Sequence, residues 1–253
     1  MGFTENNYEN AVMELFRDSL GYSSFYGPDV GRDYRDSLFR DVLYVALEKL
    51  NPYLPSSAID FAINKLRDFE SGTLLQKNKT FMDYLQNGVP VTYVKNGEEV
   101  SDIAYLVDYD NTDANSFIVA NQWTIEEHSE KRPDIIVFLN GLPIVVFELK
   151  SPSREETEVS EAYSQLRNYM KEIPSLFYYN AFLVMSDMAT SKAGTITAGE
   201  DRFMEWKTTD GNYEDTQLAN FTTLIEGMFA KERLLDILKN FICFSGDAKI
   251  LAA

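Results

Sequence analysis

The chain has 253 residues and a mass of 28.9 kDa, which corresponds to one large domain or two small ones. With 45% hydrophobic residues it can bury a substantial core, and its apolar runs are too short for a membrane-spanning helix. No charged and then apolar leader follows Met1, so we expect a cytoplasmic protein. Because the sequence holds one cysteine, Cys243, and one histidine, His128, an internal disulfide and the common zinc sites of these residues are excluded.

The net charge is strongly negative. Lys and Arg number 23 and Asp and Glu number 40, which gives −17 and a pI near 4.4. Such a charge argues against a nucleic-acid partner, because binding phosphates usually requires a basic surface. The charge is uneven, however, since residues 96–130 contain nine acidic residues and neither Lys nor Arg. We therefore expect any DNA-facing surface to lie outside this acidic segment.

The first third of the chain has apolar residues at helical spacing. The pattern predicts helices over residues 5–20, 36–50, 56–69 and 75–87, and glycines follow the first and the last of them. A period of two then predicts a β-hairpin formed by Val89–Val94 and Val100–Asp108, with a turn at Asn96-Gly97.

The rest of the chain mixes strands and helices. Further strands are predicted at Ser116–Ala120, Ile135–Leu139, Leu142–Leu149 and Ala181–Met185, and short ones at Thr195–Thr197 and Phe203–Trp206. Helices are predicted over residues 156–172 and, in two pieces broken near Lys231, over residues 216–242. This order indicates an α/β (α+β) fold with a helical flank at 1–88, a mixed-sheet core at 89–215 and C-terminal helices at 216–253.

Three charged residues lie at the ends of two β-rich runs that Asn140-Gly141 separates. Asp134 precedes the first run, and Glu148 and Lys150 close the second, two positions apart and therefore on one face of the strand. Charged side chains at the end of an apolar strand are costly to bury unless something compensates them. A divalent cation bound by the two carboxylates would do so, and Mg²⁺ prefers such oxygen ligands.

The register of this hairpin decides whether the two carboxylates can share a metal ion. A two-residue loop at Asn140-Gly141 would place Asp134 opposite Phe147, on the other face from Glu148. A three-residue loop that includes Leu142 would place Asp134 directly opposite Glu148. The shared site therefore requires the three-residue loop or a bulge elsewhere in the hairpin.

The spacing Pro-Asp, thirteen residues, Glu-x-Lys resembles the signature of the PD-(D/E)xK nucleases, and the neighbouring residues sharpen the resemblance. The segment from Arg132 to Lys150 resembles the N-terminal nuclease domain of type I restriction enzyme R subunits almost residue for residue. Other segments resemble the same family: Asn121-Gln122, Gln165 to Tyr169, Tyr179 to Val184, Gly194 to Thr197 and Arg233 to Asp236. The resemblance covers most of the chain, weakens before residue 75, and implies a single restriction-endonuclease-like nuclease domain over residues 1–253.

The resemblance also implies roles for individual residues. Asp134, Glu148 and the Leu149 carbonyl would bind Mg²⁺, for which Mn²⁺ can substitute, and Lys150 would position the attacking water and stabilise charge on the phosphate. Gln165 and Tyr169, one helical turn apart, would reach back to this site. The resemblance suggests Glu9 as an extra metal ligand, with Glu5 and Glu14 as rivals and a solvated first-turn acid as the favoured alternative. Four basic residues would contact DNA: Lys131, Arg132, Arg154 and Arg167.

In the family this domain precedes two motor domains that hydrolyse ATP and translocate DNA. No Gly-x-x-x-x-Gly-Lys-Ser/Thr phosphate loop occurs in the sequence, so ATP binding would belong to those domains and not to this chain. The implied function is cleavage of unmodified foreign double-stranded DNA, in a complex with methyltransferase and specificity subunits. The alternative is a catalytically silent scaffold of the same fold that docks the other subunits.

Two further residues are predicted to take no part in catalysis. His128 lies among three glutamates, which favours a surface position. Cys243 lies between Ile242 and Phe244, which favours a buried core thiol.

Overall fold

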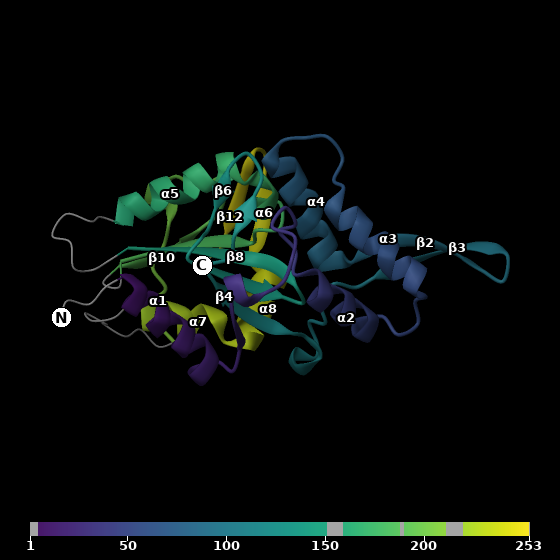
Figure 1. Ribbon diagram of the computed structural model, residues 1–253, viewed down its shortest axis with the longest axis horizontal. Helices are drawn as coiled ribbons and strands as arrows, with labels where there is room; N and C mark the ends of the chain where they lie inside the picture. The colour runs from purple at the N-terminus through teal and green to yellow at the C-terminus, as the bar shows by residue number, and fades with distance from the viewer. Residues whose placement is uncertain (1–4, 151–158, 188–189, 211–219, 253) are drawn as a thin grey trace.

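The computed structural model describes residues 5–150, 159–187, 190–210 and 220–252. Its centre is a six-stranded mixed sheet in the order β1-β4-β7-β8-β9-β10. These strands are β1 (Ser23–Tyr26), β4 (Phe117–Asn121), β7 (Ile135–Leu139), β8 (Leu142–Leu149), β9 (Phe182–Ser186) and β10 (Ser191–Gly194). The mixed sheet with flanking helices confirms the predicted fold class (Figure 1).

The sheet joins antiparallel and parallel pairs. Strands β4, β7 and β8 run antiparallel in succession, whereas β9 runs parallel to β8 and β1 runs parallel to β4. A parallel pair requires a crossover connection, and the connection from β8 to β9 contains helix α5 (Val159–Glu172). This crossover places α5 against β8 and β9.

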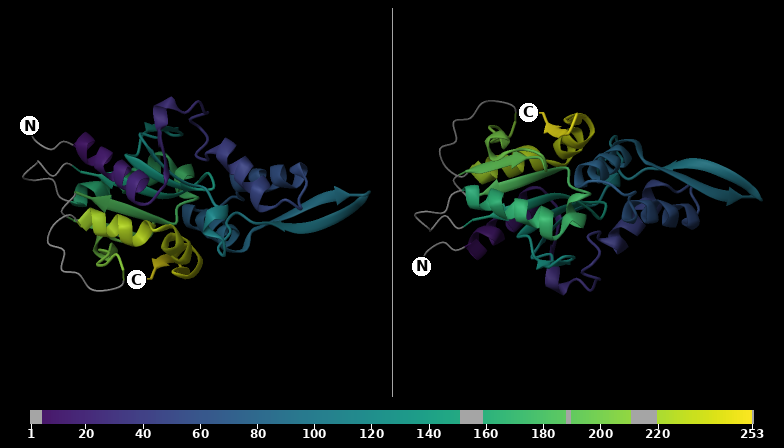
Figure 2. Two further views of the ribbon diagram at one scale, coloured as in Figure 1. Left: turned by 90° about the horizontal axis from the view of Figure 1, so that it is seen from below. Right: turned by 90° about the horizontal axis from the view of Figure 1, so that it is seen from above.

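Helices cover both faces of the sheet (Figure 2). Helix α5 lies on one face, where Ile136 and Val146 pack in the same cluster as Leu166 of α5. Helices α1 (Glu5–Glu14) and α7 (Asn220–Phe229) lie on the other face, over the alternate residues Ile135 and Phe147. Since β8 is a central strand and every one of its residues is buried, the catalytic candidates at its end adjoin the core of the sheet.

The N-terminal helical flank forms as the sequence predicted. It contains α2 (Arg40–Leu50), α3 (Ser56–Arg67) and α4 (Leu74–Asn87), and α4 begins at a capping box formed by Thr73 and Gln76. The predicted hairpin follows as β2 (Val89–Lys95) and β3 (Glu98–Ala104), and Figure 1 shows it projecting from the body of the molecule. Three short elements lie between the strands and helices of the core: β5 (Ile125–Glu126), β6 (Glu130–Lys131) and α6 (Pro174–Phe177).

The C-terminal part differs from the prediction. The helix break near Lys231 is confirmed, because α8 (Lys231–Asn240) follows α7, but a hairpin of β11 (Ile242–Ser245) and β12 (Ala248–Leu251) ends the described chain. In this hairpin Ile242 is buried and Cys243 points outward, so the prediction of a buried thiol was wrong.

The predicted short strands at Thr195–Thr197 and Phe203–Trp206 were also wrong. The last strand of the sheet lies earlier, in β10, and Met204 makes only a single bridge to Ala193. His128 is exposed, as predicted. Among the described residues, no helix combines the length and the apolar run needed to cross a bilayer.

Candidate active site at the ends of strands β7 and β8

The register of the β7–β8 hairpin brings Asp134 opposite Glu148. The turn has two residues, Asn140 and Gly141, whose φ angles of 52° and 82° are those of a type I′ turn. A register shift between Val137 and Phe138 then adds one residue, so that Ile135 pairs with Phe147. The predicted alternative of a bulge elsewhere in the hairpin is therefore confirmed, and the three-residue loop does not form.

The contacts of the strand ends hold three predicted residues together. Asp134 Oδ2 accepts a hydrogen bond of 2.7 Å from the Leu149 backbone N–H, which ties the end of β7 to that of β8. Lys150 Nζ donates to Glu148 Oε1 at 2.6 Å, and the side chains of this pair are only 17% and 4% exposed. Asp134, Glu148 and Lys150 thus gather at one end of the sheet, on the side that α5 covers.

Helix α5 adds Tyr169 and Gln165 to this group. The Tyr169 phenol is 4% exposed, and burial raises its pKa well above the usual value, with the Glu148 charge as the next cause. The charge of Asp134 also contributes to the raised pKa. Tyr169 therefore lies close enough to both carboxylates to sense their charge, and Gln165 lies one helical turn before it on α5.

Glu9 approaches the same end of the sheet from the opposite face. Its carboxylate is 5% exposed, and its two oxygens accept hydrogen bonds of 2.6 Å from Asn121 Nδ2 and 2.7 Å from Gln122 Nε2. The favoured expectation of a solvated first-turn acid was therefore wrong. Of the two rivals, Glu14 is exposed, and the side chain of Glu5 lies outside the described residues.

Gln122 links Glu9 to Asp134. Its φ of 54° is left-handed, and its backbone N–H donates to the Asp134 carbonyl oxygen at 3.0 Å. The sequence resemblance included Gln122 but assigned no role to it. Ser186 was also missed: its carbonyl accepts the Lys150 N–H at 2.8 Å, and its hydroxyl is 2.5 Å from the Tyr8 phenol.

The structure describes three of the four basic residues predicted to contact DNA. Lys131 is half-buried and Arg132 is exposed, and both precede Asp134 closely in the chain. Arg167 is exposed, and its guanidinium donates to the Ile196 carbonyl at 2.7 Å. Arg154 lies outside the described residues.

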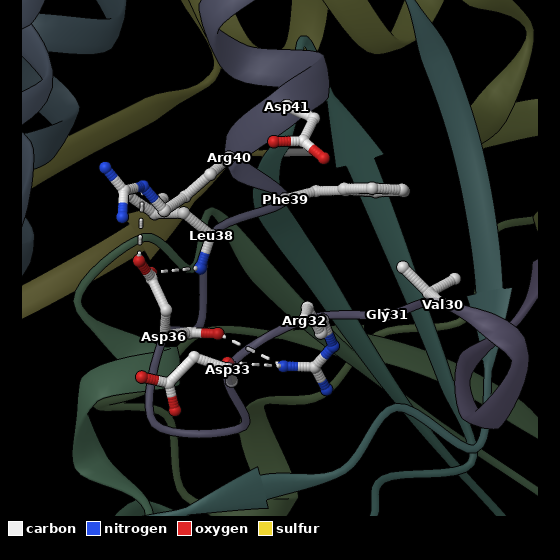
Figure 3. Close-up of a pocket in the computed structure, with 9 residues that line it drawn as sticks. All are labelled: Val30, Gly31, Arg32, Asp33, Asp36, Leu38, Phe39, Arg40 and Asp41. Atoms are coloured by element: carbon white, nitrogen blue, oxygen red, sulfur yellow. Dashed lines mark hydrogen bonds and ion pairs between the residues drawn. The ribbon is translucent and has the colours of Figure 1, made fainter.

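A pocket of about 150 Å³ lies at the other end of the hairpin (Figure 3). It is lined by residues between Val30 and Asp41, and Phe39 donates its N–H to Gly141 in the β7–β8 turn. Asp36 in this pocket is already paired with Arg40 and Arg67. The pocket is therefore separate from the candidate active site.

The donor set suits a hard divalent cation. Two carboxylates and a backbone carbonyl offer oxygen ligands, and Mg²⁺ is usually bound through one or two carboxylates while it retains several waters. The described residues contain no group of three or more His, Cys, Asp or Glu side chains in metal-binding arrangement, so Mg²⁺ at this site would keep water ligands. Zinc would find none of the nitrogen or sulfur ligands that it prefers.

Comparison with known proteins gives a consistent family match. Residues 2–202 match the family described as type I restriction enzyme R protein N terminus. The type I restriction enzyme HindI endonuclease subunit of Haemophilus influenzae is 36% identical over 96% of this chain, and a Methanocaldococcus jannaschii protein is 31% identical over 92%. The type I restriction enzyme EcoprrI endonuclease subunit of Escherichia coli is 30% identical over 58% of the chain and 48% of its own length. The chain spans about a quarter of the first two relatives, which match over 24% and 25% of their lengths.

Proposed function

Because the chain belongs to the family of type I restriction enzyme R protein N termini, we propose that it is the nuclease domain of an R subunit and hydrolyses phosphodiester bonds of double-stranded DNA with Mg²⁺. The observation that carries this proposal is the bulged hairpin, which sets Asp134 opposite Glu148 with Lys150 on the same side. The proposed substrate is unmodified foreign DNA, which motor domains in other parts of the protein would deliver by hydrolysing ATP. The proposed partners are methyltransferase and specificity subunits.

In the proposed mechanism each group has a separate task. Asp134, Glu148 and the Leu149 carbonyl would hold Mg²⁺, which polarises the phosphate and lowers the pKa of a bound water. The Lys150 ammonium orients the attacking water and stabilises the negative charge that builds on the phosphate. Tyr169 and Gln165 would orient Glu148 from helix α5, since the buried Tyr169 phenol lies within the field of the Glu148 charge. Glu9 holds the end of β4 through Asn121 and Gln122, and we propose it as an additional ligand only if the metal displaces these amides.

Calorimetric titration of the chain with Mn²⁺ tests the proposal. We expect one binding site that Asp134→Asn and Glu148→Gln each abolish. The control is Glu126→Gln, which alters an exposed carboxylate in the acidic segment. Crystals soaked in Mn²⁺ should show the ion between Asp134 and Glu148. Absence of binding in the wild-type chain and in the longer protein would favour the silent scaffold instead.

A further inference from the structure

Lys249 is a buried lysine of the C-terminal hairpin. Its side chain is 3% exposed, and Nζ donates to Asn78 Oδ1 at 2.9 Å and to the Asn180 carbonyl at 2.5 Å. No carboxylate pairs with it among the ion pairs of the described residues. Burying an ammonium group without a carboxylate partner is unfavourable, although the Phe244 ring centre lies 5.7 Å from Nζ, and burial lowers the pKa of Lys249 well below its ordinary value.

The backbone of Lys249 fastens β12 to the segment that follows β10. The Lys249 carbonyl accepts hydrogen bonds from the hydroxyls of Thr195 at 2.7 Å and Thr197 at 3.1 Å. Its N–H donates to Thr197 Oγ1 at 2.8 Å. The backbone of Lys249 thus attaches the hairpin to Thr195 and Thr197, and its buried side chain attaches it to Asn78 and Asn180.

The same segment holds helix α5. The Ile196 carbonyl accepts from Arg167 at 2.7 Å, and the Ala198 carbonyl accepts from the Tyr163 hydroxyl at 3.2 Å. Ile196 is 4% exposed and belongs to the apolar cluster that contains Tyr169. Residues 195–198 therefore lie between the C-terminal hairpin and the helix that carries Gln165 and Tyr169.

A lysine at this position fixes the register of the hairpin. The next residue, Ile250, is 42% exposed, and a slip of β12 by one residue would bury Ile250 and expose Lys249. Apolar burial alone does not select the native register, because the same slip would expose Leu251, which packs against the core. The slipped register would, however, remove Lys249 Nζ from Asn78 Oδ1. This buried oxygen would then lose its hydrogen-bond donor, which is costly. The buried lysine thus specifies the native register at the expense of stability.

We propose that Lys249 is a positioning residue of the active site: it locks β12 onto residues 195–198 and thereby fixes α5 with Gln165 and Tyr169. The catalytic importance of this positioning rests on the proposed function. The coupling between the hairpin and helix α5 rests only on the contacts described above. The C-terminal hairpin of β11 and β12 would thus stabilise the position of helix α5 from outside the active site.

Hydrogen–deuterium exchange of the 253-residue chain tests the coupling. Lys249→Met keeps an aliphatic stem but removes the ammonium, and Thr197→Val removes the hydroxyl that bonds the Lys249 backbone. We expect each variant to speed amide exchange in residues 159–172 by about tenfold, the effect of one lost hydrogen bond on local opening. Lys95→Met, at the exposed end of β2, is the matched control and should leave this exchange unchanged.

A second readout separates positioning from mere structural support. Mn²⁺ affinities are compared under conditions in which the variants and the wild-type chain are equally stable to urea. Under these conditions we expect the two variants to bind Mn²⁺ several-fold more weakly than the wild-type chain. Unchanged exchange of residues 159–172 in both variants would refute the coupling, and faster exchange with unchanged Mn²⁺ affinity would refute the positioning role. If the wild-type chain bound no Mn²⁺ while exchange still accelerated, the coupling would hold and the proposed function would fail.

Discussion

The Glu148–Lys150 ion pair provides a sharp test of how burial sets the strength of an interaction in this fold. Lys150 Nζ and Glu148 Oε1 are 2.6 Å apart, and the side chains are 17% and 4% exposed. Removing one member of such a buried pair leaves the other charge without its partner, which costs about 3 kcal/mol. We therefore expect Lys150→Met and Glu148→Gln each to lower the urea midpoint by roughly 1 M. The double variant should recover about 2 kcal/mol of the summed losses.

The chain contains a matched control for this double-mutant cycle. Lys207 Nζ and Glu205 Oε2 are also 2.6 Å apart and also two positions apart, but their side chains are 57% and 31% exposed. A surface pair of this kind contributes only about 0.5 kcal/mol. Urea unfolding followed by circular dichroism measures both cycles. If the coupling energy of the buried pair did not exceed that of the exposed pair, burial would not be the determining factor and the reasoning would be refuted.

Three further predictions concern catalysis, stability and DNA binding. In the longer protein, Lys150→Ala should abolish DNA cleavage and leave ATP hydrolysis intact, and a normal cutting rate would contradict the role of Lys150. Gly141→Ala should lower the free energy of unfolding by well over 2 kcal/mol, because the added Cβ would lie 2.6 Å from the Leu43 nitrogen. Gly97 has a similar φ of 85° but open space around it, so Gly97→Ala should cost only about 1 kcal/mol. Equal losses of the two variants in chemical unfolding would refute this reasoning. The chain alone, with its net charge of −17, should bind labelled duplex weakly at physiological salt, and submicromolar binding in titrations at two salt concentrations would reveal a basic groove.

The buried Lys249 gives the pH dependence of stability a definite sign. Its pKa is lowered in the native state, so the unfolded chain binds more protons at this residue, and stability rises with pH. The free energy of unfolding of the wild-type chain should therefore increase relative to that of Lys249→Met as the pH rises toward the ordinary lysine pKa of about 10.4. Denaturant titrations at several pH values measure this difference, and a difference that stays constant would argue against a depressed pKa.

Much of the core could be predicted from sequence because local signals were strong there. The runs that became β7 and β8 are apolar except for Glu148 and flank an Asn-Gly turn, so their bounds were predicted correctly. The spacing of four residues likewise predicted that Gln165 and Tyr169 share one face of a helix. What could not be predicted depended on distant partners. The bulge between Val137 and Phe138 has no local signature, and the burial of Glu9 depends on Asn121 and Gln122, more than a hundred positions away.

Short exposed strands were missed for a related reason. All four residues of β1 are exposed, and the segment is a strand only because it pairs with β4. The C-terminal hairpin alternates weakly, and its inward residue at one position is Lys249, which any hydrophobic pattern assigns to the surface. The polar network of Asn78, Asn180 and Lys249 overrides that pattern, so sequence periodicity fails at the place where a buried polar group determines the register.

One departure from regular backbone geometry lies at the end of the sheet where the candidate catalytic residues lie. The described residues contain three non-glycine positions with positive φ, and two of them, Asn96 and Asn140, belong to the two-residue hairpin turns. Gln122 has no such turn to explain it, and a left-handed conformation costs a residue of this type about 1 kcal/mol. Its N–H bonds the Asp134 carbonyl and its side chain bonds Glu9, so the strained residue joins helix α1 on one face to the aspartate that α5 faces on the other. A strained residue beside a buried ion pair is typical of a functional site, where the surrounding structure holds a costly geometry in place.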